Sequence, residues 1–130
     1  MVFINKTSSK PYYEQLMLGI KEEIISGLLK PGDQLPSVRE MARQLMMNPN
    51  TVSKAYKLLE SQDVIITVKG KGTYIKTIDQ ELRNESQILK LKKQLNDLVI
   101  EANYLTISKA EMNAWLEEIY NHLKGESRCD

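Results

Sequence analysis

Hydrophobic residues recur every three or four positions in three segments of the first 60 residues, which is the period of an amphipathic helix. In the first segment, which Pro11 opens, they are Tyr13, Leu16, Ile20 and Ile24, and Gly27 follows as a favourable helix stop. The second and third segments show the same pattern at Val38, Met41, Ala42 and Leu45, and at Val52, Ala55, Tyr56 and Leu59. The pattern therefore predicts three short helices, preceded by a polar, extended arm over residues 1–9.

The second and third helices carry start signals and are separated by a tight turn. Ser37 lies three residues before Glu40, so we expect the Ser37 hydroxyl to accept from the Glu40 amide while the Glu40 carboxylate reaches back. Asn48 is a good N-cap, and Pro49 suits the first helical position. This spacing predicts a helix-turn-helix, whose second helix presents polar residues away from its apolar stripe: Asn50, Thr51, Ser53 and Lys54. A plain helix hairpin with a solvated polar face is the alternative for this fragment alone.

A β-hairpin is predicted after the third helix. Residues 64–68 and 73–75 are rich in β-branched residues, and Lys69-Gly70-Lys71-Gly72 lies between them. The glycines permit positive φ at the tip, and no acid neighbours the two lysines. Such a basic tip beside a helix-turn-helix can contact phosphates or enter the minor groove. An ordinary surface hairpin whose lysines serve solubility is the alternative.

The predicted order of elements in the first part of the chain is therefore a helix, a turn at residues 30–33, a second helix, a tight turn, a third helix and a two-stranded wing. This order is that of a winged helix-turn-helix, in which the N-terminal residues of the recognition helix contact base edges. We therefore expect double-stranded DNA as a partner. A winged helix that serves only protein–protein interaction is the competing interpretation.

Two further amphipathic segments follow. Ile88, Leu91, Leu95, Leu98, Ala102 and Leu105 alternate steps of three and four, as in the seam of a coiled coil. Ser108 and Glu111 form a second capping box, and after it come Met112, Trp115, Leu116, Ile119, Tyr120 and Leu123. Two such stripes exceed what a small wing can cover, so we expect a homodimer interface; the alternative is that both helices fold back on their own head. The predicted fold is mainly α with a small β wing: a head over residues 1–78 and a helical dimerisation region over residues 79–130.

Charge and cysteine content refine this picture slightly. The net charge is +1, but residues 1–78 carry 11 Lys and Arg against 7 Asp and Glu, whereas residues 79–130 carry 7 against 10. The basic excess belongs to the head, which permits DNA binding without requiring it. Cys129 is the only cysteine, and no signal or membrane segment is visible, so we expect a soluble cytoplasmic protein without a disulfide.

Nothing in the sequence indicates an enzyme. His122, the one histidine, lies near Glu118 on the last predicted helix, with no second histidine or cysteine at metal-ligand spacing. We therefore predict no catalytic residue, no metal site and no cofactor. Trp115, Tyr104, Tyr120 and the methionines could line a cleft for a small-molecule effector, but such stripes are more often core.

The motifs resemble those of the GntR family of transcription regulators, and within it the short YtrA-like branch. The matching text is Pro11-Tyr12-Tyr13-Glu14-Gln15-Leu16, Gly27, Pro31-Gly32-Asp33-Gln34-Leu35-Pro36-Ser37-Val38-Arg39-Glu40, Asn48-Pro49-Asn50-Thr51-Val52, Ala55-Tyr56 and Gly70-Lys71-Gly72-Thr73-Tyr74. The resemblance implies a winged-helix repressor that acts as a homodimer on a near-palindromic operator and dimerises through a C-terminal helical pair.

Carried over onto matching positions, the resemblance implies DNA contacts at Ser37, Arg39, Asn48, Asn50, Thr51, Ser53, Lys54, Lys69, Gly70 and Lys71. Three positions depart from the family pattern. Met46 stands where the turn usually has glycine, Asp63 stands where glycine usually follows the recognition helix, and Ser53 replaces the arginine of longer members. A methionine disfavours positive φ, so we expect local strain or an altered turn at Met46.

Overall fold

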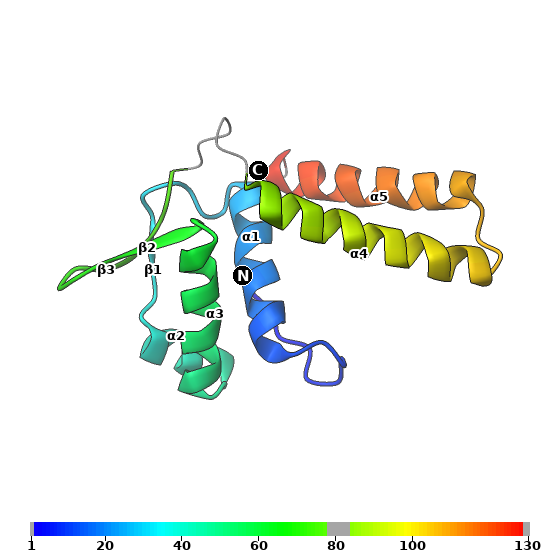
Figure 1. The fold of residues 1–130 in the computed structure, drawn as a ribbon. Coiled ribbons are helices and arrows are strands. Elements are labelled where there is room, and N and C mark those ends of the chain that lie inside the picture. The colour runs from blue at the N-terminus through cyan, green and yellow to red at the C-terminus, as the bar shows by residue number, and fades with distance from the viewer. Residues whose placement is uncertain (1, 78–83, 129–130) are drawn as a thin grey trace. The chain divides into compact units, whose positions relative to one another are not determined.

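The computed structural model describes residues 2–77 and 84–128 of the 130-residue chain. They form two compact units, residues 2–77 and residues 84–126. The first contains α1 (Tyr12–Ser26), β1 (Gln34–Leu35), α2 (Val38–Leu45), α3 (Pro49–Ser61), β2 (Ile65–Val68) and β3 (Gly72–Ile75), and the second contains α4 (Glu85–Tyr104) and α5 (Lys109–Arg128) (Figure 1). The expected fold class, mainly α with a small β wing, is confirmed. The predicted boundary at residues 78 and 79 lies outside the described residues, as does Cys129.

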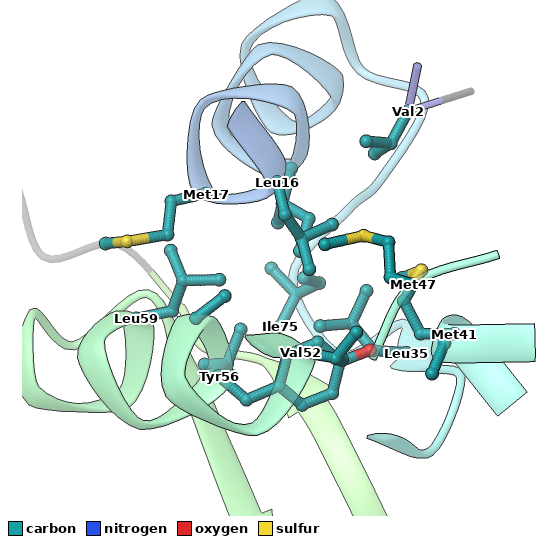
Figure 2. Close-up of a cluster of buried hydrophobic side chains, with 14 residues drawn as sticks. Val2, Leu16, Met17, Leu35, Met41, Met47, Val52, Tyr56, Leu59 and Ile75 are labelled. Carbon is teal, nitrogen blue, oxygen red and sulfur yellow. The ribbon is translucent and has the colours of Figure 1, made fainter. Parts of the chain in front are cut away.

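The core of the first unit lies where α3 packs against α1, α2 and the start of β2. Leu16 of α1 and Val52 and Leu59 of α3 are fully buried there (Figure 2). Ile20 of α1 and Ile65 of β2 are fully buried as well. Each such aliphatic side chain stabilises the fold by roughly 1.5–3 kcal/mol relative to exposure. The apolar stripes predicted from the sequence for the first three helices therefore form one shared core.

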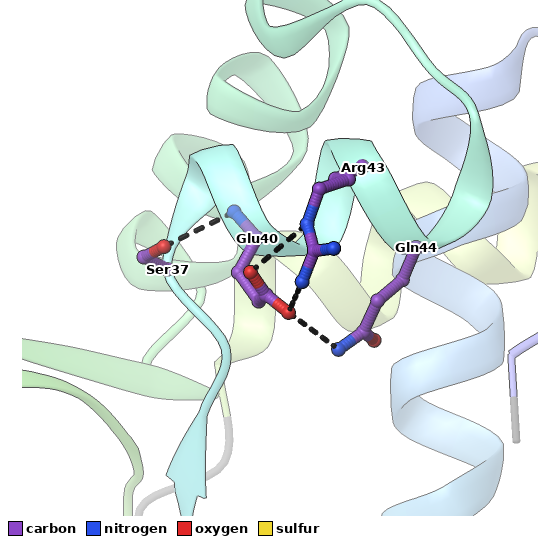
Figure 3. A network of polar contacts seen from close by, with 4 residues as sticks. All are labelled: Ser37, Glu40, Arg43 and Gln44. Atoms are coloured by element: carbon purple, nitrogen blue, oxygen red, sulfur yellow. Dashed lines mark hydrogen bonds and ion pairs between the residues drawn. The ribbon is translucent and has the colours of Figure 1, made fainter.

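The caps of α2 and α3 follow the sequence signals in part. The Ser37 hydroxyl accepts from the Glu40 amide at 3.1 Å, and the Asn48 side chain accepts from the Asn50 amide at 2.8 Å. The reciprocal half of the predicted capping box at α2 is wrong. The Glu40 carboxylate accepts hydrogen bonds from Arg43 and Gln44, one turn further along the same helix (Figure 3).

The sheet has one strand more than the two-stranded wing predicted from the sequence. β1 pairs antiparallel with β3, so that the strand order is β1-β3-β2. The loop before β1 is tied to the same strand, because Gly32 donates to the Ile75 carbonyl and Ile75 donates to the Asp33 carbonyl, both at 2.8 Å. A two-residue strand that is followed directly by Pro36 has no periodicity of its own, and its pairing partner lies almost forty residues away along the chain.

The N-terminal segment is not the extended polar arm that we expected. Val2 is buried against α1, where a side chain at Gly19 would place its Cβ atom 2.7 Å from Val2 Cγ1. Asn5 and Gln15 exchange hydrogen bonds: the Asn5 amide donates to Oε1 of Gln15, and Nε2 of Gln15 donates to the Asn5 carbonyl. The segment folds back because one apolar residue finds a site over a glycine.

Two residues that replace the expected glycines adopt the glycine conformation. Met46, between α2 and α3, has φ 55° and ψ 48°, and Asp63, after α3, has φ 61°. The Met47 amide donates to the Ala42 carbonyl at 2.9 Å, which closes the end of α2. The turn therefore keeps its geometry in spite of the side chain, and the Met46 side chain is 79% exposed.

The second unit is a pair of helices that run in opposite directions (Figure 1). The Asn84 side chain caps α4, and the Ser108 hydroxyl accepts from the Glu111 amide at 3.1 Å, which confirms the predicted start of α5. The turn between them is closed by the Ile107 amide, which donates to the Ala102 carbonyl. No helix within the described ranges is long and apolar enough to cross a membrane.

The strained turn yields a stability prediction. The left-handed conformation of Met46 costs a non-glycine residue about 1–2 kcal/mol, and Met46→Gly removes this cost. The loss of conformational entropy that glycine suffers on folding is smaller. We expect the free energy of unfolding to rise by about 0.5–1 kcal/mol in urea titrations. Gln44→Gly, a glycine introduced within α2, is the control and should lower the free energy of unfolding. A less stable Met46→Gly variant would show that the Met46 side chain stabilises the turn.

Candidate nucleic-acid interface

Arg39 lies in the first turn of α2 with its guanidinium exposed. Within residues 2–77 it makes no hydrogen bond or ion pair, and two acidic residues of the same region, Glu40 and Asp33, have other partners. Glu40 accepts from Arg43 and Gln44, and Oδ2 of Asp33 accepts from the Lys30 amide at 2.9 Å. Arg39 therefore does not support the fold through an ion pair with Glu40 or Asp33. Its fork of donors is open to a partner.

The electrostatics of α2 follow from the same network. The Arg43 guanidinium and the Gln44 amide beside Glu40 hold the pKa of that carboxyl below its usual range. Glu40 thus stays ionised and neutralises the charge of Arg43. The two arginines of α2 therefore differ in whether a carboxylate pairs with them. Arg43 is paired, and Arg39 is available.

The exposed face of α3 is polar and basic along two turns. Asn50, Ser53, Lys54, Lys57 and Leu58 line one shallow hollow on the surface of this helix. The Lys54 ammonium lies 4.1 Å from the centre of the Tyr13 ring, a cation–π contact that holds the side chain against α1. Thr51 is half-buried, and Asn48 and Ser37 both use their side chains as caps while remaining exposed.

Lys57 was missed by the sequence reasoning. It lies seven residues after Asn50 and four after Ser53, which places all three on one side of an α-helix. The sequence alone contains this spacing, but the rule that a recognition helix contacts bases with its N-terminal residues does not extend to Lys57. The structure adds it to the polar face of α3.

Tyr56 fixes the start of α2 relative to α3. Its hydroxyl donates to the Pro36 carbonyl at 2.7 Å, one residue before the Ser37 cap. Burial raises the pKa of the Tyr56 hydroxyl, so the group stays protonated and remains a donor. The sequence placed Tyr56 in the apolar stripe of α3 and gave no sign of this bond, because its acceptor is a backbone carbonyl distant in sequence.

The wing tip presents two lysines. The last ladder pair is Val68 with Gly72, and Lys69, Gly70 and Lys71 lie beyond it, all exposed. Gly70 has φ 80°, and the Lys71 amide donates to the Val68 carbonyl at 2.9 Å, which closes the turn. In the part of the head that the structure describes, neither lysine has an acidic partner: the ion pairs there join Arg43 with Glu40 and Lys76 with Asp63.

The residues predicted to dimerise lie on α4 and α5, and most remain in contact with solvent. Leu91, Leu95 and Leu98 of α4 are exposed, as are Leu105, which follows the last residue of α4, and Trp115, Leu116 and Ile119 of α5. Ala102 is buried, and Ile88 and Met112 are half-buried. Since α4 and α5 do not cover their own stripes, a wide apolar surface is left on this unit. Among the described residues, no group of three His, Cys, Asp or Glu side chains could hold a metal ion.

A sequence comparison now decides the family. Residues 12–75 match the family described as bacterial regulatory proteins, gntR family. Over all 130 residues the chain is 42% identical to the HTH-type transcriptional repressor YtrA of Bacillus subtilis, with both chains covered completely. The chain belongs to the GntR family. It is a DNA-binding transcription regulator of the YtrA-like type, as the motifs predicted, and its family and relatives are regulators, not enzymes.

Solved structures agree with this assignment. A transcriptional antiterminator from Listeria monocytogenes EGD-e is similar with a TM-score of 0.91 and 38% identity, covering 95% of this chain and 92% of that one. The DNA-binding domain of AraR, solved in complex with its operator ORX1, gives a TM-score of 0.51 and 29% identity over 56% of this chain and 90% of that domain. The first similarity extends over both units, and the second covers about half of the chain.

Proposed function

We propose that this GntR-family regulator is a homodimeric repressor that reads a near-palindromic operator with its first unit and dimerises through its second. The observation that carries the proposal is the contrast between the two units. One leaves Arg39, Lys69 and Lys71 unpaired beside a polar helix face, whereas the other leaves large apolar side chains in solvent. Its Bacillus subtilis relative is named a repressor, which supports the direction of regulation. A regulator that binds chromosomal DNA in this way would act in the cytoplasm.

Base reading is assigned to α2 and the start of α3. The arginine fork of Arg39 matches the O6 and N7 atoms of guanine in the major groove. Asn50, Thr51 and Ser53 offer amide and hydroxyl groups at the N-terminal end of α3, where a recognition helix contacts base edges. Ser37 and Asn48 lie at helix starts, which suit phosphate oxygens.

Phosphate contacts are assigned to the lysines. Lys54 and Lys57 lie on the outer face of α3, and Lys69 and Lys71 flank Gly70 at the wing tip. The four cations carry no sequence information; they position the protein and supply salt-dependent affinity. Gly70 lets the wing backbone approach closely.

A second copy of the chain is the partner that suits α4 and α5. Leu95 and Leu98 are 52% and 58% exposed, and Ile119 of α5 is 57% exposed. Such stripes along both helices are typical of a bundle that is completed by a symmetric copy. A two-fold dimer also presents two reading heads, which matches an operator of two related half-sites. Dimerisation and operator symmetry thus support one another.

The dimer is tested by charging the stripe of α4. Leu95→Glu combined with Leu98→Glu should convert a dimer of about twice 15 kDa into a monomer, measured by sedimentation. Binding to a two-half-site operator should weaken by about 10²–10⁴-fold, because the second half-site no longer binds as part of one unit. The control is Asn96→Glu with Asn103→Glu, which adds the same charge on the other side of α4. A stable wild-type monomer at micromolar concentration would contradict the proposal.

The wing is tested by salt dependence. Each phosphate contact contributes a slope of about −0.9 in log K against log salt concentration. We expect Lys69→Ala and Lys71→Ala each to weaken binding to operator and random DNA alike, and to flatten the slope by up to about one unit. Lys90→Ala on α4 serves as the control. An unchanged slope in the double variant would mean that the hairpin stays off the backbone.

Base reading is tested at Arg39. We expect Arg39→Ala to cost roughly 1–3 kcal/mol on the operator and to relax preference at one G·C pair in each half-site. Non-specific affinity should fall much less. Arg43→Ala, which removes the paired arginine of the same helix, is the matched control. Titrations across single-base operator variants distinguish base reading from a phosphate contact. An equal loss of affinity at every variant would mean that Arg39 contacts only phosphate. A module that serves only protein interaction would show no operator binding in the first place.

A further inference from the structure

The carbonyl of Lys71, at the tip of the wing, accepts two side-chain hydrogen bonds. Nε2 of Gln34 donates to it at 3.3 Å, and the Tyr74 hydroxyl donates to it at 3.0 Å. A carbonyl at an exposed hairpin tip would otherwise bond to water. Here both donors come from the protein, so the peptide group that follows Lys71 is held in place.

The two donors are brought together by the short strand β1. Gln34 and Tyr74 are directly paired residues of the β1–β3 ladder, so their side chains lie on the same face of the sheet. The opposite face carries Leu35 and Ile75, which are buried in the core. Leu35 thus anchors β1 in the core, while the Gln34 side chain on the other face reaches the wing tip.

Gly72 makes room for this contact. A Cβ atom at position 72 would lie 2.6 Å from Nε2 of Gln34, and the φ of Gly72 is 120°, which other residues rarely adopt. The glycine next to the wing lysines is therefore explained by the passage of the Gln34 side chain, as well as by the turn.

We infer that Gln34 and Tyr74 are positioning residues for DNA binding, which clamp the Lys71 carbonyl so that Lys69 and Lys71 are held ready for phosphates. This inference rests on the proposed contact of the wing with DNA. Ordering a flexible loop on binding costs affinity, and a loop that is already ordered avoids this cost. Neither residue needs to touch DNA for this role.

The same segment also ties the wing to the helices. Two residues after Gln34, the Pro36 carbonyl accepts from Tyr56 of α3, and Ser37 then caps α2. Residues 34–37 thus connect the wing tip with the start of α2 and with the second half of α3. A wing held through this segment keeps a fixed position relative to Arg39 and Asn50.

The test uses the full-length protein with Gln34→Met and Tyr74→Phe, which keep side-chain size and remove the donors. We expect the double variant to bind operator DNA about tenfold more weakly, since the wing tip with one or both of its lysine side chains, Lys69 and Lys71, must then be ordered on binding. In a background of Lys69→Ala with Lys71→Ala, the same substitutions should change affinity by less than about twofold, so the two pairs are coupled. Tyr12→Phe, which removes an exposed hydroxyl of α1, is the matched control.

The outcomes separate the two proposals. A merely structural role would lower the melting temperature and reduce affinity equally in both lysine backgrounds, which would overturn the positioning role. If the lysine substitutions weaken operator binding as expected but Gln34→Met and Tyr74→Phe do not, the positioning role is overturned. The proposed contact of the wing with DNA would then still stand. If the lysine substitutions themselves leave affinity and salt slope unchanged, the wing contact fails, and the positioning role falls with it.

Discussion

Burial of one side of α3 is the constraint on which the rest of the first unit depends. Val52, Ala55 and Leu59 have no exposed surface, and their spacing allows only one rotation of the helix against α1, α2 and β2. Asn50, Ser53, Lys54 and Lys57 must then face outward on the opposite side. The polar face of the recognition helix is therefore set by its apolar residues.

A small number of polar hydrogen bonds fixes the positions of α2 and α3 relative to each other. Asn48 fixes the first turn of α3, and Ser37 fixes the first turn of α2. Tyr56, in the second half of α3, ties that helix to the start of α2 through the Pro36 carbonyl. Glu40 selects Arg43 as its partner and so leaves Arg39 free. None of these bonds lies in the second unit, where exposed leucines along α4 and Ile119 on α5 form an apolar surface that the proposed dimer would cover.

The parts of the fold that were predictable are those coded by local pattern. The stripes of α1, α2 and α3, the caps at Ser37, Asn48 and Ser108, and the glycine-rich hairpin all follow from residues within one or two turns of each other. What the sequence did not reveal depends on contacts between distant segments. β1 exists because β3 supplies its partner, Val2 is buried because Gly19 leaves space, and Glu40 turns to Arg43 because the side-chain donors compete with the amide of the cap. The predicted DNA contacts, in turn, remain predictions about a partner, and the structure adds Lys57 to them.

The most direct test is selection of bound sequences from random double-stranded DNA by the full-length protein. The proposal predicts enrichment of an inverted repeat whose half-sites are centred about one helical turn, roughly 10–10.5 base pairs, apart. Each half-site should contain one strongly preferred G·C pair, which is lost when the selection is repeated with Arg39→Ala. Enrichment of a single, non-repeated site, or of no sequence at all, would contradict a symmetric dimer that reads its operator through α2 and α3.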